Sequence, residues 1–145
     1  MNPGKNNFSL AAKAFIIDDD KLLILKRTPN NIQSPSIWEV PGGRMNKDET
    51  PEEGLLREVK EETNLEIEIL EHISTRKFTR FDKQRIKMLV FLSKPLSKEI
   101  KLSKEHTDYE WINLENGKEK ITKFFYKEID IINKTRISNL NLLKP

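Results

Sequence analysis

The chain has 145 residues, of which 36% are hydrophobic and 34% are charged, with a formal net charge of +3 at pH 7. This length and polarity predict a single globular domain over residues 1–145, and the mildly positive balance suits anionic ligands. The sequence has no cysteine, which excludes disulfides, zinc–thiolate sites and thiol nucleophiles. Its longest apolar runs span a few residues, so we expect no membrane span and a cytoplasmic location.

A β-hairpin is predicted after a loose, polar N-terminus over Met1 to Phe8. Ser9 to Ile17 and Lys21 to Arg27 have the composition of two paired strands, and Asp18 to Asp20 lies between them. Three adjacent acids could form a metal cluster, but aspartate favours turns. We therefore predict a three-residue hairpin loop at this position.

A glycine-containing turn follows the next predicted strand. Thr28 to Ser36 is a polar loop with two prolines, and Ile37 to Val40 is a short strand that leads into Pro41 to Gly43. The two glycines of this turn allow the backbone to approach a ligand closely. Trp38 has two open interpretations, a platform that stacks on a base or an anchor in the core.

The clearest helix signal runs from about Pro51 to Thr63. Thr50 is the predicted N-cap, Pro51 suits the first helical position, and Glu53 completes a capping box. Three glutamates are spaced so that their carboxylates share one face of this helix: Glu58, Glu61 and Glu62. Crowded carboxylates repel one another, and a hard cation such as Mg²⁺, which takes oxygen ligands, would reverse that repulsion. The alternative is a solvated acidic face.

Two further strands and a basic segment follow the helix. Leu65 to Ile73 largely alternates apolar and polar residues, as a half-buried strand does, and Ile86 to Ser93 is the best candidate for a central buried strand. Ser74 to Arg85, between them, is strongly basic and contains Phe78 and Phe81. This pattern suits contact with nucleic acid, and it suits equally a twisted hairpin with a charged outer face.

The C-terminal part combines an isolated acid, a strand and a helix. Glu105 precedes the predicted strand Tyr109 to Ile112. Glu119 to Asn133 places apolar side chains at helical spacing, namely Ile121, Phe124, Phe125, Ile129 and Ile132. We predict that this helix packs on the core and that Thr135 to Pro145 is a short tail that frays.

The segment from Gly43 to Leu65 resembles the Nudix box, G-x5-E-x7-R-E-U-x-E-E-x-G-U, in which U is an aliphatic residue. The matching positions are Gly43, Glu49, Arg57, Glu58, Val59, Glu61, Glu62 and Leu65. Asn64 departs from the pattern, because the family has its last glycine there. That glycine ends the helix, and asparagine is the commonest other residue to tolerate the left-handed conformation, so we expect an intact metal site.

The resemblance implies an α/β (α+β) fold, a Nudix-like α/β/α sandwich with a mixed β-sheet between helices and the order β-β-β-α-β-β-β-α. It also implies a metal-dependent hydrolase that cleaves the phosphoanhydride bond of a nucleoside diphosphate linked to another moiety. In such enzymes Mg²⁺ or Mn²⁺ holds phosphate oxygens and lowers the pKa of a bound water.

The family's metal ligands carry over onto residues of the box. They would be Glu58, Glu61, Glu62 and the backbone carbonyl of Gly43. Arg57 would pair with Glu49 and hold the loop that contains Gly42 against the helix, which is an orienting role.

The resemblance leaves the general base open between Glu58 and Glu105, because the loop before a Trp-containing strand can supply a further carboxylate in the family. Arg27, at the end of the second predicted strand, is a candidate substrate contact for phosphate by its position. A plain surface charge is the alternative for Arg27.

We predict a nucleoside or deoxynucleoside triphosphate pyrophosphohydrolase, because a compact chain without an obvious dimerising extension is typical of that activity. ADP-ribose and dinucleoside polyphosphates are alternative substrates, and so is the 5′ end of RNA, for which the basic Ser74 to Arg85 is the one hint. A non-catalytic nucleotide-binding module usually goes with a degraded box, whereas this box keeps all its acids. A monomer or a homodimer is compatible with the sequence.

Overall fold

The structure is a computed structural model that describes residues 8–143. Its strands and α-helices are β1 (Ser9–Asp18), β2 (Lys21–Arg27), β3 (Trp38–Glu39), β4 (Gly42–Arg44), α1 (Pro51–Thr63), β5 (Ile67–Thr79), β6 (Arg85–Pro95), β7 (His106–Asn113) and α2 (Tyr126–Leu143). Two short 3₁₀ turns, η1 (Leu114–Glu119) and η2 (Lys123–Phe125), precede α2. In the described part of the chain, no helix combines the length and apolar composition that crossing a bilayer requires.

The sheet is mixed and follows the strand order β3-β2-β1-β6-β5. β1 runs parallel to β6 and antiparallel to β4, while β5 is antiparallel to β6. β1 and β2 pair at the two positions next to their turn, and β2 then pairs with β3 and β7. The prediction that Ile86 to Ser93 forms an internal strand is confirmed, because β6 lies between β1 and β5.

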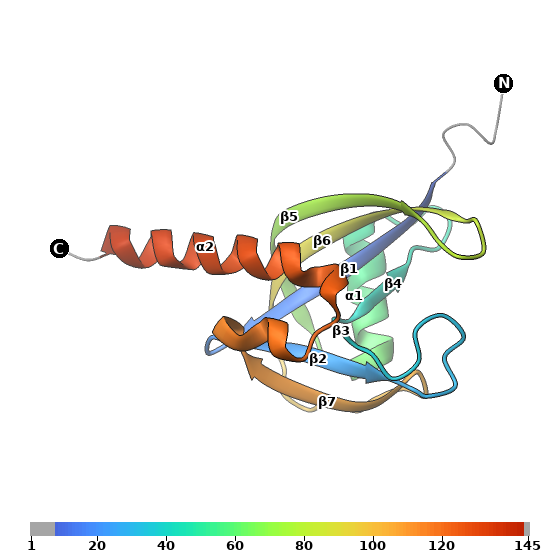
Figure 1. Ribbon diagram of the computed structural model, residues 1–145, viewed down its shortest axis with the longest axis horizontal. Coiled ribbons are helices and arrows are strands. Elements are labelled where there is room, and N and C mark those ends of the chain that lie inside the picture. Colours follow the sequence, from blue (N-terminus) through green and yellow to red (C-terminus); the bar gives the residue numbers. More distant parts are fainter. Residues whose placement is uncertain (1–7, 144–145) are drawn as a thin grey trace, which may run out of the picture.

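Two helices cover opposite faces of this sheet (Figure 1). Alternation along β1 divides its apolar residues between the faces. Leu55 and Val59 of α1 belong to one buried cluster with the even-numbered residues Ala12, Ala14 and Ile16. Ile129 and Ile132 of α2 belong to the other cluster, with Ala11 and Phe15. The predicted α/β/α sandwich with a mixed sheet is therefore confirmed.

Both predicted ends of α1 are confirmed. The hydroxyl of Thr50 accepts from the amide of Glu53, and the Glu53 carboxylate accepts from the amide of Thr50, which completes the capping box. At the other end Asn64 is left-handed, with φ 71° and ψ 1°, and its N–H donates to the carbonyl of Lys60. These caps define both ends of the helix that carries the acidic face.

The predicted three-residue hairpin loop is shorter in the structure. β1 extends to Asp18, and the turn consists of Asp19 and Asp20, with φ of 51° and 63°. A two-residue turn with positive φ at both positions matches the twist of the flanking strands, and aspartate is among the residues that tolerate it. The turn that follows β3 also differs, because Gly42 and Gly43 pair with β1 as part of β4.

The predicted start of the last helix is wrong. The α-helix begins at Tyr126 rather than Glu119, because Thr122 is extended, with φ −56° and ψ 143°, and donates its N–H to the carbonyl of Trp38. The apolar positions still reach the core, since Ile121 and Phe125 are buried. The helix also continues to Leu143, through most of the predicted tail. Residues 144–145 of that tail and residues 1–7 of the predicted N-terminal segment lie outside the described residues.

Candidate active site

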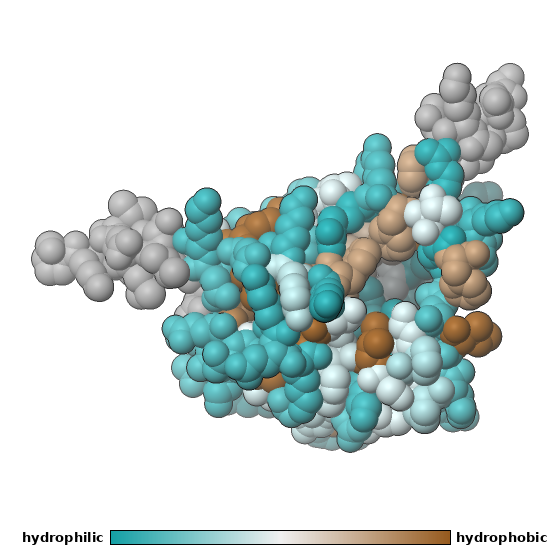
Figure 2. Space-filling model, in the orientation of Figure 1, coloured by the Kyte–Doolittle hydropathy of each residue, from teal (hydrophilic) through white to brown (hydrophobic). Residues whose placement is uncertain are grey.

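A cavity of about 700 Å³ opens on the face of the sheet that α2 covers. It lies between the loop after β2, the β5–β6 hairpin and the start of β7, and Figure 2 shows the surface hollowed there, with apolar residues beside the hollow. One end is lined by ionisable side chains, which are Lys13, Arg27, Glu39, Arg44, Glu62, Glu105 and His106. The other end is mainly apolar and aromatic, with Phe78, Ile86, Met88, Phe124 and Phe125, and Arg80 also lines the cavity.

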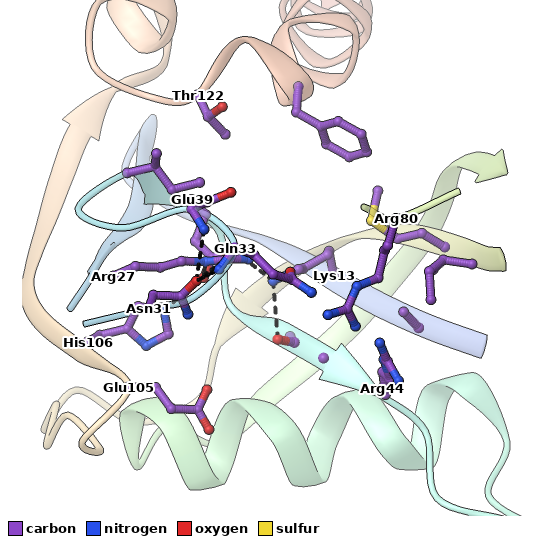
Figure 3. A pocket seen from close by; sticks show the side chains of 18 of the residues that line it. Lys13, Arg27, Asn31, Gln33, Glu39, Arg44, Arg80, Glu105, His106 and Thr122 are labelled. Atoms are coloured by element: carbon purple, nitrogen blue, oxygen red, sulfur yellow. Dashed lines mark hydrogen bonds and ion pairs between the residues drawn. The ribbon is translucent and has the colours of Figure 1, made fainter. Parts of the chain in front are cut away.

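Glu39 is the centre of a buried network at the ionisable end (Figure 3). Its carboxylate accepts from Arg27 twice, at 2.8 and 2.9 Å, and from the ammonium of Lys13 at 3.0 Å. Nε2 of His106 lies 2.9 Å from the same carboxylate. Lys13 also donates to the carbonyls of Val40 and Gly42, both at 3.2 Å. The side chain of Glu39 therefore connects four strands, β1, β2, β3 and β7.

These partners decide the charge of Glu39. Burial alone would raise the pKa of this carboxyl, but Lys13, His106 and Arg27 together hold the pKa well below its usual range. Burial would lower the pKa of Arg27, and Glu39 outweighs it, so the guanidinium pKa is raised. Glu39 is therefore a carboxylate with its charge compensated from three sides.

Glu62 is also buried, at 3% exposure, but its surroundings differ. One oxygen accepts from the amide of Gly42 at 2.7 Å. Burial raises the pKa of Glu62 to about 8, against the smaller lowering effects of Lys13 and of the Gly42 amide. Gly42 has a φ of 136°, and a side chain there would collide with the carbonyl oxygen of Ala12. A glycine at this position thus lets the amide reach the carboxylate.

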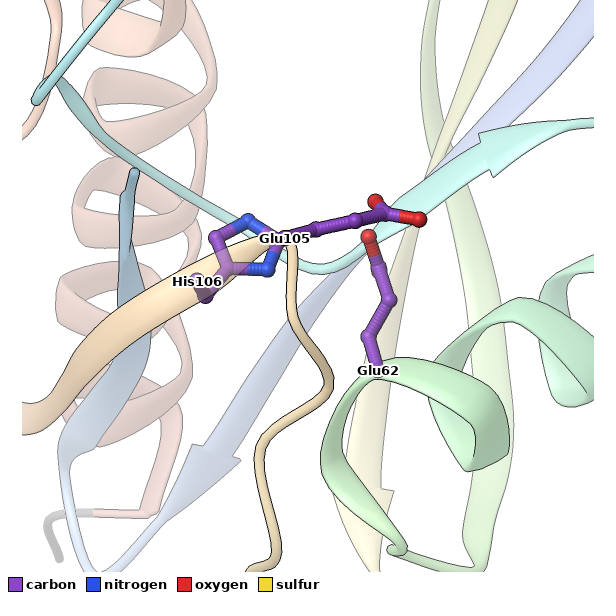
Figure 4. Close-up of side chains that lie close together, drawn as sticks. All are labelled: Glu62, Glu105 and His106. Atoms are coloured by element: carbon purple, nitrogen blue, oxygen red, sulfur yellow. The ribbon is translucent and has the colours of Figure 1, made fainter. Parts of the chain in front are cut away.

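Glu62 lies close to Glu105, which directly precedes β7, and to His106, the first residue of β7 (Figure 4). One ligand atom each from Glu62, Glu105 and His106 lies within 4.8 Å of the other two. The backbone fixes this approach, because the amide of Ser103 donates to the carbonyl of Glu62, and the amide of Thr28 donates to the carbonyl of Glu105. Glu105, which the family resemblance suggested as a further carboxylate, therefore lies close to the Nudix-box residue Glu62.

Arg57 connects the loop before α1 to the helix. Its guanidinium donates to Glu49 at 2.7 and 3.0 Å and to the carbonyl of Arg44 at 3.1 Å. Glu49 in turn accepts from the amide of Asn46 at 2.6 Å. The hydrogen bond with Arg57 is the main reason that the pKa of Glu49 is lowered, and the Glu49 partner raises the pKa of Arg57. The expected pairing of Arg57 with Glu49 is present.

The remaining acids of the box lie beside this arginine. Nη1 of Arg57 lies 3.1 Å from Glu58 and 3.2 Å from both oxygens of Glu61. Burial raises the pKa of Glu58, against the lowering by Arg57, whereas Glu61 has a side chain that is 57% exposed. A Cβ on Gly43 would lie 2.7 Å from Glu58, so this glycine allows the main chain to touch the carboxylate.

Phe124, at the aromatic end of the cavity, is fixed by contacts with two residues of β5. Phe124 stacks edge-on against Phe78, with ring centres 5.2 Å apart. Arg76 donates to the carbonyl of Phe124 and lies 4.5 Å from the centre of its ring. Arg76 is itself placed by Glu128 of α2, at 3.3 Å, and Glu128 accepts from Ser74 at 2.7 Å. The wall of the cavity is therefore anchored to both β5 and α2.

All three arginines of the basic segment Ser74 to Arg85 contact other residues of the protein. Besides Arg76, Arg80 pairs with Asp82 at 3.4 Å and lines the cavity, and Arg85 lies 4.2 Å from the ring centre of Phe8. These contacts favour the charged-hairpin interpretation over a surface for nucleic acid. Trp38 similarly packs against the core cluster and under Lys120, which favours its role as an anchor.

The sequence interpretation placed Arg27 and Glu105 at the site but missed Lys13, Glu39 and His106. A signal for Lys13 was present, since it is the one charged residue inside the apolar run of β1. Arg44 was also missed. It lines the cavity, and among the described residues its side chain has neither a hydrogen bond nor an ion pair.

The donor atoms of the site fit a divalent cation. Glu58, Glu62 and Glu105 supply carboxylates, and the main chain of Gly43 lies against one of them. Oxygen ligands of this kind are those that Mg²⁺ and Mn²⁺ take in proteins. The buried carboxylate of Glu62, with its raised pKa, is the group that a bound positive charge would stabilise most.

Three comparisons with known proteins show what this chain is similar to. The sequence model of the family described as NUDIX domain matches residues 7–130. A MutT-like protein of Streptomyces ambofaciens is 32% identical over 124 residues, which is 86% of this chain and 75% of the relative. The nucleoside triphosphatase NudI of Escherichia coli strain K12 is 28% identical over 111 residues, which cover 70% of this chain and 79% of the relative. The crystal structure of the MutT protein from Methanosarcina mazei Go1 superimposes with a TM-score of 0.76 at 28% identity, covering 93% of this chain and 97% of that one.

Proposed function

The chain belongs to the NUDIX domain family and is a Nudix hydrolase acting on pyrophosphate bonds of nucleoside diphosphate derivatives, and from that premise we propose that its substrates are nucleoside or deoxynucleoside triphosphates. The products would be a nucleoside monophosphate and pyrophosphate. We further propose that the reaction requires Mg²⁺ or Mn²⁺.

The observation that carries this proposal is the chemical polarity of the cavity. Carboxylates and cationic side chains line one end, and Phe78, Phe124 and Phe125 line the other. A nucleotide has the matching polarity, with an anionic phosphate chain that requires cations and a flat base that stacks on aromatic rings. In this orientation the base would lie between β5 and η2, and the phosphates would face α1.

A triphosphate suits this cavity better than a substrate with two bases. The residues that line the cavity place their aromatic rings at one end, which supports one base. The name of the E. coli relative, a nucleoside triphosphatase, points in the same direction. Dinucleoside polyphosphates and ADP-ribose are the alternatives that the experiment below separates from a triphosphate.

Phosphate binding would fall to arginines of the ionisable end. Arg27 is the predicted phosphate contact, and its bidentate pair with Glu39 orients a guanidinium at the cavity. Arg44, the last residue of β4, is a second candidate. Arginine presents a planar set of donors that matches phosphate oxygens.

The cation would be held by Glu58, Glu61, Glu62, Glu105 and the carbonyl of Gly43, and when bound it would neutralise phosphate charge and acidify a water. Arg57 would orient Glu58 and Glu61 through the hydrogen bonds described above. The proton of the attacking water would pass to Glu105 or to Glu58. Glu105 has the easier access, because it is exposed on its loop whereas Glu58 is half-buried.

The test is a substrate panel with Mg²⁺ and Mn²⁺. The panel contains ribo- and deoxyribonucleoside triphosphates, ADP-ribose, a dinucleoside tetraphosphate and a 5′-triphosphorylated RNA, with products identified by anion-exchange chromatography. We expect the highest kcat/KM for a triphosphate and release of pyrophosphate rather than phosphate. A higher kcat/KM for ADP-ribose or for the dinucleotide would overturn the proposal.

Glu105→Gln, assayed at saturating metal so that a weakened cation site does not limit the rate, tests whether Glu105 is the base. General-base catalysis typically contributes about 10²- to 10⁴-fold, so kcat should fall by that order while nucleotide affinity stays near normal. Full turnover of Glu105→Gln at saturating metal would transfer the role to Glu58. Glu52→Gln, an exposed acid in the first turn of α1, is the matched control for loss of one charge.

A further inference from the structure

His106 has one ring nitrogen in use and one free. Its side chain is 1% exposed, and Nε2 lies 2.9 Å from Glu39. Nδ1 is buried and has no hydrogen-bond partner among the described residues. A buried polar atom without a partner is costly, so such an atom in a native site points to a ligand.

The network around Glu39 determines which nitrogen carries the proton. An ionised carboxylate accepts hydrogen bonds and donates none, so Nε2 must carry the hydrogen that it shares with Glu39. In the neutral imidazole Nδ1 then holds a lone pair, which is the form that binds a metal. Lys13 and Arg27 keep Glu39 in place for this contact.

His106 forms a group of potential metal ligands with two carboxylates, and because Nε2 is occupied by Glu39, Nδ1 is the ring nitrogen available to an ion. Glu62 reaches this group from α1, and Glu105 and His106 reach it from the start of β7 (Figure 4). One ligand atom from each lies within 4.8 Å of the other two. Two ligands at about 2.1 Å from one ion can be up to about 4.2 Å apart, so these three atoms lie close to the spacing that one ion requires.

We propose that Nδ1 of His106 joins the carboxylates of Glu62 and Glu105 in a mixed nitrogen–oxygen site that selects a divalent transition metal, Mn²⁺ or Co²⁺, over Mg²⁺. This inference rests on the cation dependence proposed above and specifies the ligands and the class of ion. His106 is not part of the box, and the family resemblance assigns it no role.

The donor atoms give the reason for the selectivity. Imidazole nitrogen suits transition metals, whose affinity for such sites rises from Mn²⁺ to Co²⁺, whereas Mg²⁺ prefers oxygen ligands and retains its waters. A metal-binding histidine almost always donates its other N–H to a carboxylate or carbonyl, which orients the ring and strengthens the ligand. Glu39 occupies that position behind His106.

The experiment measures binding of metal ions alone, by isothermal titration calorimetry with Mg²⁺, Mn²⁺ and Co²⁺ on the full chain without nucleotide. The visible absorption spectrum of the Co²⁺ complex reports nitrogen ligation independently of turnover. His106→Gln is the main variant, because its amide N–H can still reach Glu39 while the nitrogen at the Nδ1 position is lost. His72→Gln is the matched control, since His72 is exposed and outside the site.

We expect His106→Gln to weaken Co²⁺ and Mn²⁺ binding by at least about 10- to 100-fold, which is the loss caused by mutating residues that only support a metal ligand. Mg²⁺ affinity should change by less than about threefold, because Mg²⁺ uses the oxygen ligands. The Co²⁺ absorption bands should shift in His106→Gln and stay unchanged in His72→Gln.

Three outcomes decide the matter. Equal losses for all three ions, with an unchanged Co²⁺ spectrum, would overturn the inference and leave His106 as a structural partner of Glu39. If His106→Gln fails to fold, His106→Asn retains a polar atom near the Nδ1 position, and an unchanged preference for Co²⁺ over Mg²⁺ in that variant would also overturn it. Binding of no divalent ion by the wild type would instead overturn the proposed cation dependence.

Discussion

Glu39 and Glu62 are two buried carboxylates at the same end of one cavity, and their pKa values move in opposite directions. Both side chains are almost inaccessible, at 4% and 3% exposure. Glu39 is surrounded by Lys13, Arg27 and His106, which hold its pKa well below the usual range. Glu62 accepts one amide hydrogen, and burial raises its pKa to about 8.

The difference shows that burial does not by itself assign a role to a carboxylate. Desolvation acts on both groups, and the surrounding positive charge decides the result. The positive charge that compensates Glu39 comes from Lys13 and Arg27 of the protein itself, so Glu39 is suited to hold other side chains in place. Glu62 would gain most from a cation that the fold does not itself provide, which suits binding of a metal. Variants of the two glutamates should therefore affect different properties of the protein.

The largest effect is expected for the stability of Glu39→Gln. Removing this charge leaves the buried Lys13 and the half-buried Arg27 without their partner, and breaking a buried ion pair typically costs about 3–5 kcal/mol. Denaturant titration should show this loss in the free energy of unfolding. Glu110→Gln is the control, because its ion pair with Lys120 is exposed and such pairs contribute about 0–1 kcal/mol. Equal losses of unfolding free energy in Glu39→Gln and Glu110→Gln would show that Glu39 does not stabilise the fold more than an exposed ion pair does.

The second prediction is that Glu62→Gln loses activity without losing stability. The glutamine oxygen can still accept from Gly42, but the charge that would bind a cation is gone. Turnover should fall by about 10²-fold or more when a metal-held water is lost. Without added cation the melting temperature should stay the same or rise, because the buried carboxyl of Glu62, whose pKa is raised, no longer opposes folding when it ionises. A variant that is both active and destabilised would place Glu62 in the same class as Glu39.

The parts of this site that could be predicted from the sequence are those fixed by local spacing. The caps of α1, the shared face of its glutamates and the pairing of Arg57 with Glu49 all lie within one short segment. Helical geometry places such residues together without knowledge of the rest of the fold.

The Glu39 network could not be predicted in this way, because its members come from distant strands. Lys13 and Glu39 are 26 positions apart, and Glu39 and His106 are 67 apart. Their meeting depends on sheet order and register, which local periodicity does not specify. The start of α2 was missed for a similar reason, since a tertiary hydrogen bond from Thr122 to Trp38 interrupts an otherwise helical pattern.

The third prediction concerns stability as a function of pH in the absence of divalent cations. A lowered pKa means that Glu39 stabilises the fold above about pH 4.3, its value in the unfolded chain, and that this contribution is lost on further acidification. The raised pKa of Glu62 has the opposite sign, so the free energy of unfolding falls as the pH rises from about 4.3 to about 8. Each unit of pKa difference corresponds to about 1.4 kcal/mol.

Variants of Glu39 and Glu62 distinguish these two contributions to the dependence of stability on pH. Glu39→Gln should flatten the acid limb, and Glu62→Gln should flatten the limb between about pH 4.3 and 8, as measured by thermal melts with a chelator present. Identical profiles for wild type and Glu62→Gln across that window would show that burial does not raise the pKa of this carboxyl.

The smallest expected effect concerns the end of the helix that carries Glu62. Asn64 is left-handed at the C-cap, and its side chain donates to the carbonyl of Glu99 at 3.1 Å. A β-branched residue is strained at positive φ, so Asn64→Val should lower the free energy of unfolding by about 1–2 kcal/mol. Glycine relieves strain but loses the hydrogen bond, so Asn64→Gly should stay within about 0.5 kcal/mol of the wild type. Turnover should change little in either variant, because the backbone bond from Ser103 to Glu62 keeps the carboxylate in place. Denaturant midpoints for the pair measure the cap, and a large loss of turnover in Asn64→Gly would show that the position of Glu62 depends on the cap rather than on the β7 loop.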